Sequence, residues 1–216
     1  MKPLRKGCLV LLLALLFAGA GVWWVGFHSR GLNRDFDPEV VARAETKMWQ
    51  AYYAHDAEGL GRELVTLMHE QLGVAYGSAV RLTFTLGKAT MEFGRSNAGY
   101  EAKVLPGLIT FYTDAHALSG GDWDPEAVAK AELAWWVARR TPGENSAEQV
   151  SGLIAKEYAL LYGESNPDIE AAGLIRAQAA VLRDEGGAAA DWPRIESMLV
   201  DSYTRLKAGV SVEGVK

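Results

Sequence analysis

The chain has 216 residues, among them 22 basic and 27 acidic side chains, four His and one Cys. A composition of 49% hydrophobic and 23% charged residues supports a hydrophobic core and excludes disordered and collagen-like chains. A single Cys excludes an intrachain disulfide and any zinc or iron–sulfur site that requires several cysteines.

Residues 1–30 have the composition of a membrane signal anchor. They contain four basic residues and no acidic one: Lys2, Arg5, Lys6 and Arg30. Residues 7–27 form an uncharged stretch of 21 residues, and about 20 apolar residues suffice for a helix to cross the hydrocarbon core. Trp23 and Trp24 lie near its far end, where aromatic side chains prefer the membrane interface. The basic N-terminal flank predicts a single-pass helix with a cytoplasmic N-terminus.

A signal peptide cleaved after Ala20 is the alternative interpretation of the same segment. Ala18, Gly19 and Ala20 are small residues of the kind that such a cleavage site requires. Cleavage would leave the apolar residues 22–25 exposed near the new N-terminus, which favours the uncleaved anchor. Both interpretations export the rest of the chain. We therefore predict a protein of the bacterial inner membrane with a periplasmic C-terminal body.

The exported part of the chain is acidic. Of the 22 basic side chains, four lie in the anchor and 18 in the remaining chain, which also holds all 27 acidic ones and so has a net charge of −9. Nucleic acids and anionic lipid surfaces bind cationic faces, so this charge disfavours both as partners. We expect the partner to be another membrane or periplasmic protein.

The exported part also contains an internal duplication. Residues 35–51 align with 122–138 at an offset of 87, and ten of the 17 positions are identical. Residues 67–77 align with 153–163 at an offset of 86. Weaker matches follow in the same order: 88–96 with 176–184, and Tyr112 with Tyr203. A repeat of this length, with helical periodicity in each copy, is typical of helical repeat proteins.

The duplication predicts an all-α fold, in which an N-terminal transmembrane helix precedes about eight helices in two tandem four-helix repeats. The predicted segments are the anchor at 1–30, the first repeat at 31–120, the second at 121–208 and a disordered tail at 209–216. The two repeats could form two bundles side by side or one continuous helical array, and the sequence leaves both open.

Several helix boundaries are predicted from capping residues. N-cap signals open five of the helices: Asp37, Asp124, Ser146, Asn166 and Asp191. Tyr-Gly pairs at 76–77 and 162–163 predict the ends of the second helix of each repeat. Pro106-Gly107 predicts a kink or a late start in the fourth helix of repeat one. Residues 80–86 alternate as a strand would, but the Ala-rich repeat partner favours a helix there.

Glu45 and Glu132 are the most suggestive candidates for chemistry. They occupy equivalent mid-helix positions, one turn before Trp49 and Trp136. A carboxyl group held beside an aromatic ring in an apolar interior can have a raised pKa and act as an acid or base. The structural alternative is a buried acid paired with a cation such as Arg95 or Arg183, and such pairs are commoner than catalytic ones.

No other catalytic, metal or cofactor motif is recognisable. The Glu-x-x-His spacing of a di-iron carboxylate bundle is missing, as are Gly-x-Ser-x-Gly, His-Glu-x-x-His and a P-loop. We therefore predict no metal site and no cofactor.

The segment Trp135-Trp136-Val137-Ala138-Arg139-Arg140 is a candidate partner-binding surface. Adjacent tryptophans on a helix point in different directions, and Trp and Arg are enriched in binding hot spots. Packing between the two repeats is the alternative role for Trp135, Trp136, Arg139 and Arg140.

The leading prediction is a non-enzymatic, membrane-anchored accessory subunit of a membrane-associated assembly. One alternative is a hydrolase or lyase that uses Glu45 and Glu132. Another is a small-ligand carrier, in which Trp49, Trp136 and tyrosines line an aromatic pocket. A large cavity open to solvent would favour the carrier, and a packed seam would count against it.

Overall fold

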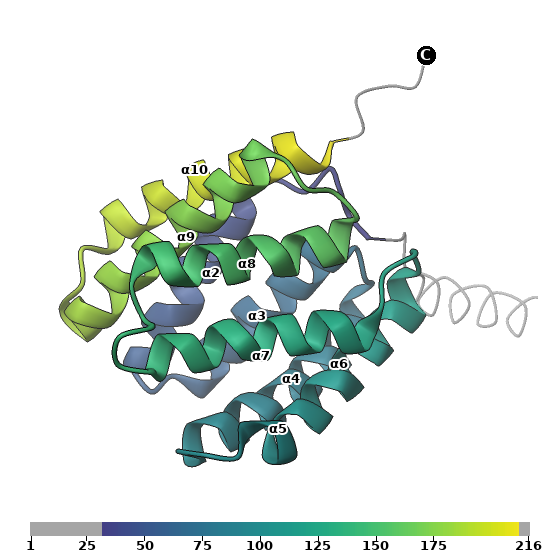
Figure 1. The fold of residues 1–216 in the computed structure, drawn as a ribbon, viewed down its shortest axis with the longest axis horizontal. Helices are drawn as coiled ribbons and strands as arrows, with labels where there is room; N and C mark the ends of the chain where they lie inside the picture. Colours follow the sequence, from purple (N-terminus) through teal and green to yellow (C-terminus); the bar gives the residue numbers. More distant parts are fainter. Residues whose placement is uncertain (1–31, 212–216) are drawn as a thin grey trace, which may run out of the picture.

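The computed structural model describes residues 32–211, which are helical throughout and contain no strand (Figure 1). These residues form nine α-helices and one short 3-10 helix. The helices are α2 (Pro38–Tyr53), α3 (Ala57–Leu72), α4 (Tyr76–Arg95), α5 (Tyr100–Lys103), α6 (Leu105–Ser119), α7 (Pro125–Arg140), α8 (Ala147–Tyr162), α9 (Pro167–Gly186), η1 (Gly187–Ala189) and α10 (Trp192–Val210). The prediction of an all-α fold is confirmed for this part of the chain.

Helix lengths repeat in the order that the duplication predicts. The pair α2 and α7 has 16 residues each, α3 and α8 also have 16 each, and α4 and α9 have 20 each. The fourth pair differs, because α6 has 15 residues and follows the four-residue α5, whereas α10 is a single helix of 19 residues. The helical repeat is therefore present in the fold as well as in the sequence.

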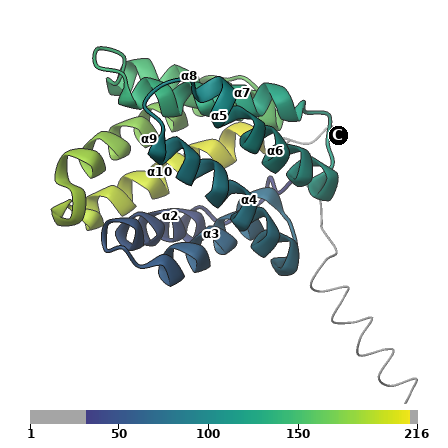
Figure 2. The same ribbon diagram turned by 90° about the horizontal axis from the view of Figure 1, so that it is seen from below.

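The long helices pack in chain order and close on themselves. Each one packs against the next, and α10 packs against α2 (Figures 1 and 2). Buried residues from all eight long helices belong to a single hydrophobic core. The two repeats thus share one core within residues 32–211 and do not form two separate bundles.

The capping residues begin the helices where the sequence predicts. Asp37 Oδ1 accepts from the backbone N–H of Glu39 at 2.9 Å, and Asp124 Oδ1 from that of Glu126 at 3.0 Å. The Ser146–Gln149 capping box, with both hydrogen bonds made, opens α8. Each bond satisfies a donor that the first helical turn leaves without a partner. The N-cap side chains of Asn166 and Asp191 do the same for α9 and α10.

Two predicted helix ends differ from the structure. α8 ends at Tyr162 as predicted, with Gly163 in the left-handed conformation at φ 72°. α3 instead ends at Leu72, because Gly73 takes the left-handed position first at φ 65°, and Tyr76 then begins α4. At the C-terminus, α10 continues through the buried Val210, two residues into the segment predicted as a disordered tail.

The interruption at Pro106 lies where the sequence places it. α5 ends at Lys103, and α6 starts at Leu105 with Pro106 in its first turn. Pro lacks the N–H that would continue the preceding helix, and it is tolerated in a first turn. The helical prediction for residues 80–86 is also confirmed, because they lie inside α4.

None of the helices in residues 32–211 combines the length and apolar character that a membrane crossing needs. The predicted anchor at residues 7–27 lies outside the described residues.

Close packing of α8 against α9 depends on the glycine at position 173. A Cβ atom added to Gly173 would lie 2.7 Å from the Ser151 carbonyl oxygen, whereas one added to Gly152 on α8 meets nothing within 4 Å. We therefore expect Gly173→Ala to destabilise the protein by about 1–3 kcal/mol through overpacking. Gly152→Ala is the matched control and should stabilise it by up to about 1 kcal/mol, because Ala favours helix. Thermal unfolding followed by circular dichroism in mild detergent measures both, and equal effects would contradict the packing argument.

Candidate functional site

Positions that the two repeats share form two similar sets of side chains in the core. In the first set, Tyr203 on α10 donates a hydrogen bond to Oε2 of Glu45 on α2. Trp49 Nε1 donates to Oε1 of the same carboxylate at 3.5 Å. The ring of Phe36 meets the ring of Tyr203 edge to face, with centroids 6.3 Å apart. The first helix of repeat one is thus joined to the last helix of repeat two.

The second set has the same composition with the repeats exchanged. Tyr112 on α6 and Trp136 on α7 place their polar groups beside the carboxyl group of Glu132, where both favour its ionised form. The ring of Trp123 meets that of Tyr112 edge to face at 6.2 Å. The sets therefore correspond residue by residue, and each joins a Glu from one repeat to a Tyr from the other.

Only the Glu45 set contains an arginine. Arg176 on α9 donates to Glu45 Oε1 from Nε at 3.3 Å and from Nη2 at 3.1 Å. Its Nη1 donates to the Tyr158 hydroxyl at 3.2 Å. Burial raises the pKa of Glu45, but the Arg176 charge and the Tyr203 hydrogen bond outweigh it, so the pKa lies below the ordinary value. Glu45 and Arg176 form a buried ion pair, with side chains 6% and 19% exposed.

Glu132 lies in the same interior without a cation of its own. Burial and, after it, the charge of the neighbouring Glu157 raise its pKa to about 8, against the weaker effects of Tyr112 and Arg176. Its Oε2 atom is buried and has no hydrogen-bond partner in the described residues. Glu132 is therefore protonated and neutral at pH 7, whereas its counterpart Glu45 is ionised.

Glu157 on α8 completes the central polar cluster, which we define as Glu45, Glu132, Glu157, Arg176, Tyr112, Tyr158 and Tyr203. Its carboxylate accepts a hydrogen bond from Trp135 Nε1 and one of 3.3 Å from the Tyr112 hydroxyl. Burial raises the pKa of Glu157, and the Arg176 charge opposes this. The cluster holds three buried carboxyl groups but only one arginine. One positive charge cannot stabilise three buried negative charges, so the three carboxyl groups do not all ionise.

A second group of charges lies at the edge of this cluster. Arg183 is buried, and its guanidinium carbon lies 3.6 Å from the ring centroid of Trp49. Its Nε donates to Asp184 at 2.8 Å, and Arg139 on α7 also pairs with Asp184. Tyr53 donates to the same carboxylate at 3.3 Å. These contacts connect α2, α7 and α9.

Solvent has little access to the central polar cluster. A cavity of about 10 Å³ lies beside Glu45, Trp49, Arg176 and Arg183. This volume holds one water molecule at most, whereas pockets for small organic ligands span roughly 300–1,000 Å³. Within residues 32–211, no three His, Cys, Asp or Glu side chains come together in a way that would hold a metal ion.

The four residues predicted to bind a partner all make contacts within the fold. Trp135 points to Glu157, and Arg139 pairs with Asp184. The ring of Trp136 packs on that of Phe93 with centroids 5.1 Å apart. The Arg140 guanidinium donates to the Phe93 carbonyl at 2.7 Å and covers its ring. These contacts describe a seam between helices, and the partner-binding role remains a prediction.

The predicted structural network is brought together only in part. Trp49 and Arg183 meet beside Glu45, but Arg95 lies exposed at the end of α4. The arginine that pairs with Glu45 is Arg176, which sequence reasoning did not single out. For the tyrosines, the sequence offered one indication, which is that Tyr112 aligns with Tyr203 in the internal repeat. In the structure these two residues occupy equivalent places beside Glu132 and Glu45.

The raised pKa of Glu132 predicts a pH-dependent stability. The native state keeps this carboxyl group protonated up to about pH 8, but the unfolded chain ionises it near 4.5. The stabilisation is therefore complete below about pH 4.5 and is lost at about 1.4 kcal/mol per pH unit as the pH rises toward 8. Glu132→Gln should flatten this slope, and Glu144→Gln in an exposed loop should not. Thermal unfolding at pH 5.5 and 8 in mild detergent measures both, and equal slopes would contradict the assignment.

The buried ion pair predicts strongly non-additive mutations. Arg176→Met leaves the Glu45 carboxylate buried without its cation, which should cost about 3–5 kcal/mol. Adding Glu45→Leu should recover part of that loss, because the uncompensated charge is then gone. Arg205→Met is the control, since its pair with Asp168 is exposed and should contribute no more than about 1 kcal/mol. Denaturant unfolding measures the set, and additive effects of Arg176→Met and Glu45→Leu would contradict the pairing.

No significant match to this chain was found among protein-family models, curated proteins or solved structures.

Proposed function

We propose that the chain is a non-catalytic accessory protein of a membrane-associated assembly. Residues 7–27 anchor it as a single-pass helix in the bacterial inner membrane, with the N-terminus in the cytoplasm. The helical body then lies in the periplasm, where it binds another protein of the assembly. The anchor is supported by the 21 uncharged residues and the basic N-terminal flank.

The observation that carries this proposal is the closed central polar cluster. It contains both candidate catalytic residues, Glu45 and Glu132, and the adjoining cavity has a volume of only about 10 Å³. A hydrolase or lyase needs its acid and base within hydrogen-bond reach of a bound substrate. A small-ligand carrier needs a pocket tens of times larger. Trp49 and Trp136 are partly buried and pack against the hydrophobic core, which supports a structural role for both.

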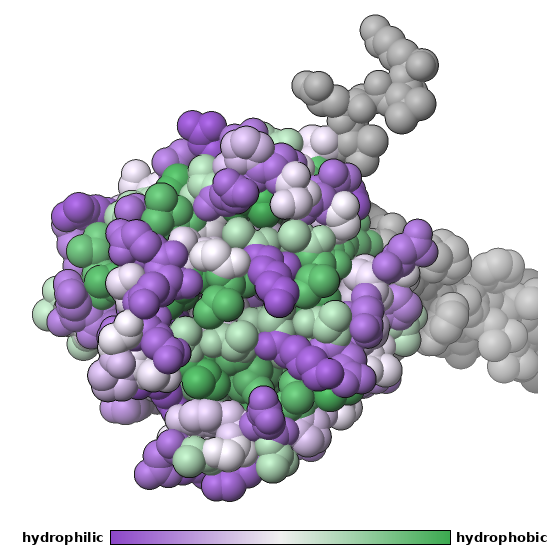
Figure 3. Space-filling view, viewed as in Figure 1, coloured by the Kyte–Doolittle hydropathy of each residue, from purple (hydrophilic) through white to green (hydrophobic). Residues whose placement is uncertain are grey.

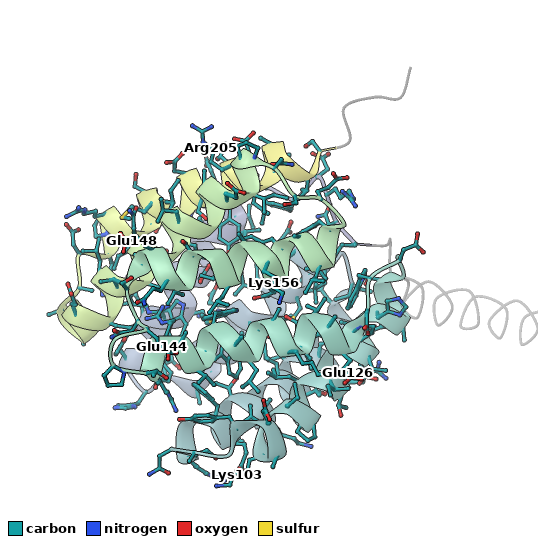
Figure 4. All side chains as sticks on the ribbon, viewed as in Figure 1. Lys103, Glu126, Glu144, Glu148, Lys156 and Arg205 are labelled. Atoms are coloured by element: carbon teal, nitrogen blue, oxygen red, sulfur yellow. The ribbon has the colours of Figure 1, made fainter. Side chains whose placement is uncertain are left out.

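One surface feature suits a protein partner. A hollow of about 500 Å³ lies between α8 and α9, on the face seen in Figure 4, where Glu148 and Lys156 are labelled. Small residues contribute to its lining: Ser151, Gly152, Ala155 and Ala159. Hydrophobic and hydrophilic residues are intermixed on this face (Figure 3). Small side chains let another helix approach closely, and charged ones at the margin set its orientation.

The anchor is tested by membrane extraction. The full chain should remain in the membrane pellet after alkaline carbonate treatment, because a spanning helix resists extraction. A chain whose residues 1–30 are replaced by a cleavable export signal is the control and should become soluble. Recovery of the natural chain in the soluble fraction, shortened by about 20 residues, would instead establish the cleaved signal peptide.

The partner surface is tested by site-specific photo-crosslinking in native membranes. A crosslinking amino acid at Lys156 should give a discrete product with one membrane or periplasmic protein. The same amino acid at Glu144, which is exposed in the loop before α8, is the control and should give none. Equal products from both positions, or none from either, would reject the hollow as the partner surface.

A further inference from the structure

The exposed hydrophobic residues gather on one helix. Five large hydrophobic side chains are exposed in residues 32–211, and four of them lie on α4: Tyr76, Val80, Phe84 and Met91. Phe84 is the most exposed of them at 68%. Single exposed hydrophobic residues are common on soluble proteins, whereas a contiguous set marks a binding surface. Figure 2 shows α4 at the front of the described part of the molecule, with α3 and α6 as its packing neighbours.

The four side chains form one stripe along the helix. At about 100° per residue, they fall within an arc of about 80° on the α4 surface. The hydrophobic residues that α4 buries in the core occupy a different arc, centred about 140° away. These are Ala79, Leu82, Leu86, Ala89 and Phe93. The helix thus has two apolar faces, and the protein itself covers one of them.

A basic stripe runs beside the exposed apolar one. Arg81, Lys88 and Arg95 are all exposed and occupy the adjoining arc of about 40°. The only acidic residue on α4 is Glu92, whose Oε1 accepts from the Ser96 hydroxyl at 3.4 Å. α4 is therefore a positively charged helix in an exported chain whose net charge is −9. An exposed apolar stripe flanked by Lys and Arg is typical of helices that lie in a membrane interface.

The start of the described chain lies close to the beginning of this helix. Asn33 Nδ2 donates to the Glu70 carbonyl in the last turns of α3 at 2.7 Å, and the turn from α3 leads directly to α4. The predicted membrane segment ends at Phe27, five residues before Leu32. Five residues span at most about 18 Å even when fully extended. The proposed anchor would therefore hold the α3–α4 corner near the lipid surface, together with the C-terminal ends of α8 and α10, whose carbonyls accept hydrogen bonds from Arg34.

We propose that the exposed face of α4 lies against an anionic lipid surface. Tyr76, Val80, Phe84 and Met91 enter the interface between headgroups and acyl chains. Arg81, Lys88 and Arg95 reach the lipid phosphates beside them with their long side chains. The inference depends on the proposed anchor, which supplies the membrane, and it fixes the orientation of the body on that membrane. The acidic remainder of the body faces away from the lipid.

The test uses the full chain reconstituted into vesicles of phosphatidylcholine with and without phosphatidylglycerol. With Cys8→Ser as background, Phe84→Cys is labelled with an environment-sensitive fluorophore. The emission of the fluorophore should shift to shorter wavelength on vesicle binding. Lipids that carry a spin label near the headgroup should quench its intensity at least two-fold. The same label at Glu148→Cys on α8 is the control and should show neither effect. Unchanged circular dichroism establishes that both labelled chains fold.

Charge provides the second arm of the experiment. Replacing Arg81, Lys88 and Arg95 by Gln should reduce quenching at position 84 in the phosphatidylglycerol vesicles, because the cationic stripe is lost. Neutralising Lys103, Lys156 and Arg205 removes the same charge elsewhere and should leave quenching unchanged. Equal losses in the two triple variants would mean that only net charge matters, and would overturn the role of the stripe.

The remaining outcomes separate this inference from the anchor. A chain that enters the vesicles and resists carbonate extraction, but whose label at position 84 is not quenched, overturns the lipid contact and leaves the anchor intact. A chain that does not enter the vesicles overturns both. Quenching that appears only at high protein-to-lipid ratio, with crosslinks between copies at position 84, would show that a second copy covers α4.

Discussion

The buried ion pair between Glu45 and Arg176 constrains the whole arrangement of helices. Glu45 lies on α2 and Arg176 on α9, so the pair connects the first helix of one repeat to the third helix of the other. Taking both charges out of water is costly, and their attraction compensates only while the geometry is kept. Tyr203 and Tyr158 bind the same two charged groups, which extends the constraint to α10 and α8. A fold that closes α10 onto α2 supplies that geometry.

The duplication explains why the core has two similar carboxyl sites, and electrostatics explains why they differ. Each Glu keeps a Trp one turn later and a Tyr from the other repeat. Arg176 pairs with Glu45, and Arg183 also lies on that side, whereas Glu132 has no paired cation in the described residues. Burial raises the pKa of Glu132 and of the neighbouring Glu157, and the charge of Glu157 raises that of Glu132 as well. A symmetric pair of residues has thereby become one ionised and one protonated group, from which we predict a pH-dependent stability.

The interior, the acidic exterior and α4 differ in polarity, and we propose a different role for each. The interior uses its charged residues for pairing, and on the exterior we propose that the α8–α9 hollow binds a protein partner. α4 departs from this pattern, because it exposes large apolar side chains next to three cations. The proposed anchor would give a physical reason for the exception, since a helix held at a lipid surface can keep an apolar face that would be a liability in free solution.

The sequence by itself determined the helical class, the duplication and most helix starts, because capping and periodicity are local interactions between residues a few positions apart. It also indicated Glu45, Glu132 and their tryptophans, since one helical turn relates each pair. The end of α3 was predicted at Tyr76-Gly77, but the helix ends at Leu72, because Gly73 already takes the left-handed conformation. Only the tertiary structure decided that Arg176 pairs with Glu45, because 131 positions separate them in the chain. It also decided that Leu82 and Leu86 face the core while Val80 and Phe84 stay exposed, since the alternating pattern shows two apolar faces without telling which one the protein covers.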